Sequence, residues 1–233
     1  PLAIIIAGII IAGAVYFSAD KSVAPTTGSS GNQQPPLGDT ASLDKMTAIS
    51  NNDHVRGDRS APVKIVEYSD IECPFCKRFH ETMKQVIDEY GKDTKVAWVY
   101  RHAPIDKLHS KARNEAVAFE CANELGGNDK FWAYADRLFE VTPSNNGLDP
   151  AELPKIAQYV GLDVNKFNTC LSSGKYAKHI QDDLDNAIAT AIDGRLGTPW
   201  SIVVAKNGKK FPVNGAVPYE SVKQLIESAL QEK

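Results

Sequence analysis

Two cysteines stand close together in the segment SDIECPFCKRFH, residues 69–80. Cys73 and Cys76 are separated by one proline and one phenylalanine. A pair at this spacing can bind a metal, close a small structural loop, or alternate between dithiol and disulfide in electron transfer. The surrounding sequence has to distinguish these three kinds of chemistry.

The metal alternative depends on Cys73, Cys76 and His80, which form a C-x2-C-x3-H pattern. A structural zinc site uses four ligands, usually with a second pair at similar tight spacing, and the sequence has no second C-x2-C and no H-x3-H. His80 is more simply interpreted as a residue on a helix surface. A purely structural disulfide is also disfavoured, because so small a ring restrains little chain entropy. The pattern favours a redox pair, and no metal site is expected.

The cysteine pair lies between an expected strand and an expected helix. Residues 63–68 (VKIVEY) form a short apolar run rich in β-branched residues, which is typical of a buried strand. Apolar residues then recur at helical spacing up to Gly91: Phe79, Met83, Val86, Ile87 and Tyr90. Cys73 falls at the helix tip, where free backbone N–H groups and the helix dipole lower the pKa of a thiol. We therefore expect Cys73 to attack a partner sulfur and the buried Cys76 to resolve the mixed disulfide.

The rest of the folded sequence predicts a small sheet interrupted by helices. Residues 96–100 (VAWVY) predict a second strand, parallel to the first, and residues 201–205 (SIVVA) predict a later one. The Asn-Gly pair at 207–208 predicts a hairpin that leads into residues 209–213 (KKFPV). From about 106 to 193 the apolar periodicity is helical throughout, so an all-helical block is inserted into an α/β fold.

The N-terminal region differs from the folded part. Residues 1–17 are apolar without one charge, and about 20 such residues cross a bilayer, so we expect an uncleaved transmembrane signal anchor. A cleaved signal peptide and a buried core helix are the alternatives. Residues 18–43 are rich in Ser, Thr, Gly, Pro and Gln and predict a disordered linker. The folded domain, residues 44–233, is then expected on the extracytoplasmic (periplasmic or outer) face of a cell membrane, where disulfides persist.

The chain resembles a known family in three places: the stretch DHVRGDRSAPVKIVEYSDIECPFCKRF, the helical block, and the late GTPW motif. Together these resemble the DsbA-like branch of the thioredoxin superfamily, the thiol:disulfide oxidoreductases of bacterial cell envelopes. The resemblance runs from about Asp53 to the end. It implies a thioredoxin fold with an inserted all-helical subdomain, with Cys73 as the nucleophile and Cys76 as the resolving cysteine. Pro74 and Phe75 would form the active-site loop.

The resemblance also implies roles for residues outside the pair. It places Pro199 as a cis-proline that faces the active-site disulfide, with Thr198 supplying backbone groups to a substrate strand. An ordinary proline opening an edge strand is the alternative. Glu67 resembles the family's buried acid, able to relay a proton to or from Cys76. The alternative is a residue that faces solvent at an edge, because an unpaired buried carboxylate is costly.

Phe75 departs from the family's best-known strong oxidant, which has histidine at this position. Phenylalanine offers no charge and no donor to stabilise a thiolate, so we expect a less oxidising pair. Thr198 is a residue also seen in isomerase and reductase relatives, so the direction of electron flow stays open.

Cys121 and Cys170 form a second candidate pair, in the helical block. Four cysteines allow three connectivities, and assigning Cys73 to Cys76 leaves these two for each other. Some DsbA-like relatives carry a disulfide at such positions, so the resemblance favours a structural disulfide here. Two separate buried thiols are the alternative.

The expected function is oxidation of cysteine pairs in exported proteins with free cysteines. The resemblance implies reoxidation by a membrane partner of the DsbB or vitamin K epoxide reductase kind, with no bound cofactor. An isomerase or reductase on the same fold is one alternative, and a metal-binding or chaperone-like interaction module is another. Isomerases of this group dimerise through an additional N-terminal domain, which the linker has no residues to build, so a monomer is expected. The formal charge of -3 disfavours nucleic acid as a partner.

Overall fold

The computed structural model describes residues 43–233, so the expected anchor at 1–17 and the linker up to residue 42 lie outside the described residues. The elements are β1 (His54–Arg56), β2 (Val63–Ser69), α3 (Pro74–Val86), a π-helical turn (Ile87–Gly91), β3 (Val96–His102), α4 (Ala112–Val141), α5 (Glu152–Tyr159), α6 (Val164–Leu171), α7 (Ala177–Thr190), a 3-10 turn (Ile192–Gly194), β4 (Trp200–Val204), β5 (Lys210–Asn214) and α8 (Tyr219–Leu230). Within 43–233, no helix combines the length and the apolar character that crossing a membrane requires.

Five strands form one mixed sheet in the order β1-β3-β2-β4-β5. β2 and β3 run parallel, with Ile65 opposite Trp98, and the other neighbouring pairs are antiparallel. β4 and β5 form the predicted hairpin, and Gly208 in its turn has φ 87°, which glycine adopts at little steric cost. β2 is therefore the central strand, and its carboxyl end leads directly into the cysteine pair.

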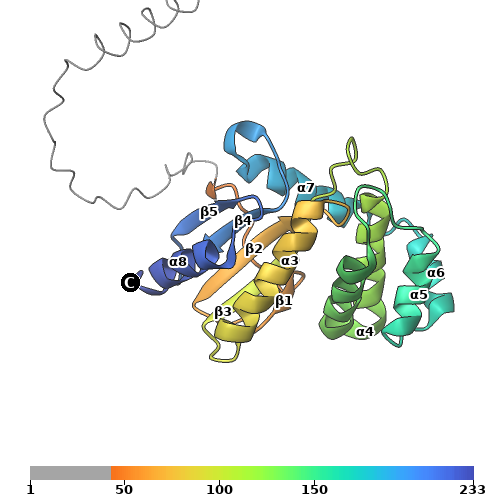
Figure 1. Ribbon diagram of the computed structural model, residues 1–233, viewed down its shortest axis with the longest axis horizontal. Coiled ribbons are helices and arrows are strands. Elements are labelled where there is room, and N and C mark those ends of the chain that lie inside the picture. Colours follow the sequence, from red (N-terminus) through yellow and green to blue (C-terminus); the bar gives the residue numbers. More distant parts are fainter. Residues whose placement is uncertain (1–42) are drawn as a thin grey trace, which may run out of the picture. The chain divides into compact units, whose positions relative to one another are not determined.

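Different helices cover the two faces of the sheet. Successive side chains of a strand point to opposite faces, and in β2 this separates Val63 and Ile65 from Val66 and Tyr68. The first two join the core beneath α3 and α8, which pack together over the same face (Figure 1). The other two join a second core that includes Ala187 of α7, and α7 contacts β2 and β3. The sheet is thus the middle layer between two sets of helices.

The predicted helical block is confirmed, because the described secondary structure between β3 and β4 is helical. α5 and α6 pack against α4, and Figure 1 shows these three helices beside the sheet while α7 returns to it. α4 is interrupted at Gly127, whose φ of 72° lies in the left-handed region. Asp163 caps α6, since its Oδ1 accepts a hydrogen bond of 3.0 Å from the amide of Lys166.

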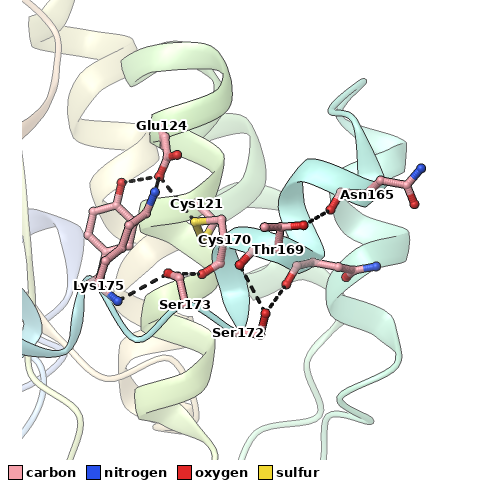
Figure 2. Close-up of a disulfide and its surroundings, with 10 residues drawn as sticks. Cys121, Glu124, Asn165, Thr169, Cys170, Ser172, Ser173 and Lys175 are labelled. Atoms are coloured by element: carbon pink, nitrogen blue, oxygen red, sulfur yellow. Dashed lines mark hydrogen bonds and ion pairs between the residues drawn. A yellow bond between two sulfur atoms is a disulfide. The ribbon is translucent and has the colours of Figure 1, made fainter.

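A disulfide joins Cys121 in α4 to Cys170 in α6 (Figure 2). Both residues are buried. Beside the bridge, Glu124 of α4 accepts a 2.8 Å hydrogen bond from Tyr176 Oη and pairs with the Lys175 ammonium. The bridge and these polar contacts hold α4 against α6 and the start of α7.

Removing this disulfide is expected to destabilise the fold. The two cysteines are 49 residues apart, and the chain-entropy treatment gives an upper value of about 4 kcal/mol for closing such a loop. A Cys121→Ser/Cys170→Ser variant should therefore lose up to about 4 kcal/mol of unfolding free energy in urea titrations, with redox turnover retained. The corresponding double alanine variant is the control for burying two hydroxyl groups. A loss within roughly 0.5 kcal/mol, as for ordinary surface substitutions, would contradict this expectation.

Candidate active site

The start of α3 places its two cysteines in different environments. Cys73 is the N-cap residue, in an extended conformation (φ -78°, ψ 120°), and Pro74 opens the helix. Proline suits this position because the N–H it lacks would have no helical partner. Cys76 is fully buried, Cys73 is 5% exposed, and both are free thiols. Both thiols are therefore buried, and only Cys73 keeps a small exposed fraction.

The Cys73 thiol is unusually acidic, with its pKa lowered to about 6. The largest cause is a hydrogen bond from the Cys76 thiol. Burial raises the pKa, but Thr198 and the backbone amides of Cys76 and Phe75 lower it further. These amides belong to the first turn of α3, where N–H groups without helical partners favour negative charge. At neutral pH Cys73 is therefore largely a thiolate, the reactive species in disulfide exchange.

The Cys76 thiol is shifted in the opposite direction. Its pKa is raised, first by burial and then by the neighbouring Cys73 and Glu67. The amide N–H of Asp70 donates to Cys76 Sγ at 3.4 Å. Cys76 therefore keeps its proton until a base removes it, whereas Cys73 does not.

The pH dependence of alkylation tests the acidity of Cys73. In the reduced protein, modification of Cys73 by iodoacetamide should rise with pH and reach half its plateau near pH 6, because only the thiolate reacts. Peptide mass spectrometry at a series of pH values provides the measurement. Cys76 serves as the internal control and should stay unmodified in the same samples. A midpoint near the roughly 8.5 of free cysteine would contradict the arrangement described above.

Pro199 precedes β4 and lies beside the cysteine pair. The peptide bond between Thr198 and Pro199 is cis. The Thr198 carbonyl oxygen accepts a hydrogen bond of 3.3 Å from Cys73 Sγ. Antiparallel pairing of Trp200 with Tyr68 brings the start of β4 to the carboxyl end of β2, where the cysteine loop begins.

Glu67 is buried in the central strand, with 1% of its surface exposed. Glu67 lies two residues after Ile65 in the same strand, so both side chains point to the face covered by α3. Because β2 is paired on both sides, the alternative of a solvent-facing edge residue is wrong. Trp98 Nε1 donates to Glu67 Oε2 at 2.9 Å, while Oε1 has no hydrogen-bond partner within the described structure. Burial raises the pKa of Glu67 to about 7, although the Trp98 hydrogen bond acts against this rise. Glu67 can therefore exchange a proton near neutral pH.

The sequence did not single out three other buried acids near the cysteine loop: Asp70, Glu72 and Glu115. Asp70 Oδ2 accepts a 2.7 Å hydrogen bond from the amide of Ile105 and lies 2.9 Å from His109 Nδ1. Burial raises the pKa of Asp70, and these hydrogen bonds oppose the rise. The loop after β3 is thereby held against the segment that leads to Cys73.

Glu72 and Glu115 form a close acidic pair. Burial, followed by the presence of Glu72, raises the pKa of Glu115 to about 9. A protonated Glu115 avoids two buried like charges. Glu72 also accepts two backbone hydrogen bonds, with Oε2 2.6 Å from the amide of Asn146 and its carbonyl oxygen 2.7 Å from the amide of Asn145. The loop after α4 is thus fixed beside the residue that precedes Cys73.

His80 does not lie on a helix surface, as its sequence position suggested. It is 1% exposed, and its Nε2 is 2.7 Å from Asp136 Oδ1 of α4. Its ring stacks on Phe139 and meets Trp98 edge-on, and burial lowers its pKa. α4 packs against α3 here, which the local sequence could not reveal. His80 therefore links two helices through Asp136.

The fold and the site together define a class of protein. A thioredoxin-like sheet with a helical insertion, and a C-x-x-C pair at the start of α3 beside a cis-proline, characterise a DsbA-like thiol–disulfide oxidoreductase. The family model described as thioredoxin matches residues 50–228. This chain belongs to the thioredoxin family.

Solved structures show the same likeness. Pseudomonas aeruginosa DsbA2 is 27% identical in sequence, with a TM-score of 0.66 over 80% of this chain and 100% of that chain. BdbD from Bacillus subtilis, in its oxidised form, is 22% identical, with a TM-score of 0.66 over 84% of this chain and 97% of that one. The likeness to BdbD concerns the fold alone.

The curated relatives are much longer proteins. "Na(+)/H(+) antiporter NhaA 3" of Salinispora tropica is 33% identical over 188 residues, which are 80% of this chain and 26% of that protein. "Na(+)/H(+) antiporter NhaA 1" of Mycolicibacterium vanbaalenii is 34% identical over 141 residues, or 60% of this chain and 22% of that protein. The chain spans about a quarter of the length of these relatives, and their name describes the whole proteins.

Proposed function

We propose that this protein introduces disulfide bonds into exported proteins through the Cys73–Cys76 pair. The observation that supports this most is the opposite shift of the two thiol pKa values, lowered for Cys73 and raised for Cys76. A stabilised thiolate favours the reduced form of the pair, and a disulfide whose reduced form is stabilised is a stronger oxidant. The pair is therefore suited to accepting electrons from substrate thiols.

In the proposed cycle, a substrate thiolate attacks Cys73 Sγ of the oxidised enzyme. The Cys73–Cys76 bond breaks, a substrate–Cys73 disulfide forms, and Cys76 leaves as a thiolate that takes up a proton. Glu67 is the proposed donor of this proton, because its pKa is about 7 and it raises the pKa of Cys76. A second substrate thiolate then attacks the substrate sulfur, and Cys73 leaves as a stabilised thiolate. The substrate loses two electrons and the enzyme gains them.

Substrate binding is proposed beside the cis-proline. The Thr198 carbonyl oxygen lies 3.3 Å from Cys73 Sγ, so it stands where an extended substrate segment would pass the reacting sulfur. Phe75 is 52% exposed, and the Arg78 guanidinium lies 5.2 Å from its ring centroid. An apolar ring at the surface favours apolar substrate side chains next to the reactive cysteine.

The reduced enzyme needs an oxidant, and we propose a membrane partner of the DsbB or vitamin K epoxide reductase kind. The Cys121–Cys170 disulfide supports an extracytoplasmic location, because disulfides persist in oxidising compartments. The composition of residues 1–17 and 18–43 favours an anchor and a linker, and the domain at 44–233 is proposed to be monomeric. Extraction of the full-length protein from membranes with alkaline carbonate tests the anchor, since an anchored chain stays in the pellet.

The reduction potential tests the direction of electron flow. We expect a value between the roughly -120 mV of DsbA and the roughly -270 mV of thioredoxin, because Cys73 is acidic while Phe75 supplies no side-chain donor. Titration in glutathione redox buffers measures it. Phe75→His should shift the potential upward, with about 30 mV for each tenfold change in the equilibrium constant. A potential at or below roughly -270 mV would instead favour the reductase alternative.

A further inference from the structure

A cluster of histidines, none of them used in the proposed cycle, surrounds one buried carboxylate. Glu120 Oε1 lies 2.8 Å from His54 Nε2, 2.9 Å from His102 Nε2 and 3.5 Å from His179 Nε2. Glu120 belongs to α4, and the three histidines belong to β1, β3 and α7. Three separate elements therefore bring nitrogen atoms to a single oxygen atom of a fourth.

One carboxylate oxygen has too few lone pairs to serve three close imidazole N–H groups well. If His54 and His179 are instead deprotonated at Nε2, these two nitrogens and the Glu120 oxygen offer lone pairs within 4.8 Å of one another. Neutral imidazole and carboxylate in this arrangement are ligands for a divalent transition metal. The cluster therefore has the ligand types and the convergence that a bound divalent cation needs.

The distances suit such a cation. The ligand atoms of His54, Glu120 and His179 all lie within 4.8 Å of one another. Zinc bonds of about 2.0–2.2 Å in a tetrahedral site separate neighbouring ligand atoms by roughly 3.3–3.5 Å. The His179–Glu120 distance of 3.5 Å already matches, and the His54–Glu120 distance of 2.8 Å requires only a small outward movement.

The site has an opening to solvent. His54, Glu120 and His179 line a cavity of about 530 Å³ whose other walls are mostly polar, including Asn51 and Asn128. The His179 side chain is 35% exposed, whereas the Glu120 side chain is 4% exposed. A metal can therefore enter from the cavity, and a water molecule can occupy its fourth position from the same side.

We propose that His54, Glu120 and His179 bind one divalent transition metal ion, with zinc as the best-fitting ion. Two histidines and one glutamate form a recurring zinc ligand set. Nitrogen ligands select against calcium and magnesium, which prefer oxygen. His102 acts as a positioning residue: it contacts the ligating oxygen of Glu120 and orients the carboxylate.

This metal would hold the helical block to the sheet. It would connect β1 with α4 and α7, and Cys121, which follows Glu120, already ties α4 to α6 through the disulfide in Figure 2. The disulfide thereby fixes the part of α4 that presents Glu120, so a site on α4 is preorganised. The proposal does not depend on the redox function.

Calorimetric titration of Zn²⁺ alone into the full chain tests the proposal. The Cys73–Cys76 pair is first oxidised, so that its thiolates cannot bind the metal. We expect one Zn²⁺ per chain, and Co²⁺ in its place should give the visible absorption of a tetrahedral site. His102→Gln should weaken binding by about 10- to 100-fold, as is usual when a residue that orients a metal ligand is replaced, and His179→Asn should weaken it further. His179 is partly exposed, so this variant should fold, and its far-UV spectrum and thermal unfolding without metal check that it does.

A matched control uses His109, which is buried like His54 but lies outside the cluster. His109→Gln should bind zinc as tightly as the unchanged protein. Equal zinc affinity in the His179→Asn variant would overturn the proposal, and so would zinc binding that requires reduction of Cys73 and Cys76. Displacement of Zn²⁺ by equimolar Ca²⁺ or Mg²⁺ would also overturn it, because a nitrogen-rich site does not prefer these ions.

Discussion

Replacing Cys76 with alanine is expected to abolish turnover and leave substrate proteins covalently attached to Cys73. The variant keeps the Cys73 sulfur that forms the mixed disulfide but cannot form the Cys73–Cys76 disulfide that accepts electrons from the substrate. Turnover should fall by at least about 10³-fold, the order seen when one member of a catalytic unit is removed. Cys73 of the variant can be charged as a mixed disulfide with thionitrobenzoate and then offered a reduced substrate with a single cysteine. Its thiolate displaces thionitrobenzoate, and it has no second thiol to release the adduct. Non-reducing electrophoresis should show an enzyme–substrate adduct that dithiothreitol releases.

Cys73→Ser is the matched control, because it removes the sulfur that the substrate attacks while Cys76 stays buried. We expect this variant to show neither turnover nor adducts, since a serine hydroxyl is not a thiolate at neutral pH. It also separates the enzyme from a chaperone-like module, whose suppression of aggregation would survive the change. Near-normal turnover of Cys76→Ala would contradict the proposed division of roles between the two cysteines.

Much of the fold and the centre of the site could be predicted from the sequence because the signals are local. The apolar run at 63–68, the cysteine pair and the helical stripe after it are adjacent, and they predict a strand, a turn and a helix in order. The Asn-Gly pair gave the last hairpin in the same way. Each prediction needed only periodicity and turn chemistry over fewer than about 20 residues.

Features that depend on distant packing could not be predicted. The face on which Glu67 lies follows from the position of β2 between β3 and β4, and the sequence does not state that order. His80 is buried because α4, more than 30 residues away, covers it, with Asp136 56 positions further along the chain. The close approach of Glu72 and Glu115 also results from packing between distant segments. The sequence does not predict it, because acids near a loop are normally solvated.

The histidine cluster illustrates the same limit. His54, Glu120 and His179 have no motif spacing, because they reach one point from three separate elements. Familiar zinc motifs are recognised by ligands three or four residues apart. Cysteines and histidines three or four residues apart occur in this sequence only at Cys73, Cys76 and His80, which is why the sequence suggested a metal only there.

Glu67→Gln is expected to slow the reaction and stabilise the protein at the same time. The pKa of Glu67 rises from 4.5 to about 7 on folding because the carboxyl group is buried. The contribution of Glu67 to stability is therefore complete below pH 4.5 and is lost as the pH rises through 7. The stability lost through Glu67 between these two pH limits is about 3 kcal/mol as an upper value.

Glutamine stays neutral and can still accept the hydrogen bond from Trp98 Nε1. At pH 8 the free energy of unfolding of the reduced variant should exceed that of the unchanged protein by up to about 3 kcal/mol, and near pH 4 the two should agree. Urea titrations at both pH values measure this. If Glu67 transfers the proton of Cys76, the substitution should slow turnover by about 100-fold, the lower range for general acid–base catalysis, and remove the step near pH 7 from the pH–rate profile.

Glu115→Gln separates these two effects. Glu115 is also a buried acid with a raised pKa, but its neighbour is Glu72, and its value of about 9 keeps it protonated over the pH range of the assay. This control should also stabilise the protein at pH 8, because a folded pKa above the unfolded value costs stability once the pH exceeds the unfolded value, but it should leave the rate step near pH 7 in place. If Glu67→Gln stabilises the protein without slowing it, Glu67 is only a costly buried acid. If it slows the reaction and removes the pH step, Glu67 supplies the proton to Cys76. Burial of Glu67 then costs stability but raises the pKa of the carboxyl group enough to keep that proton available near neutral pH.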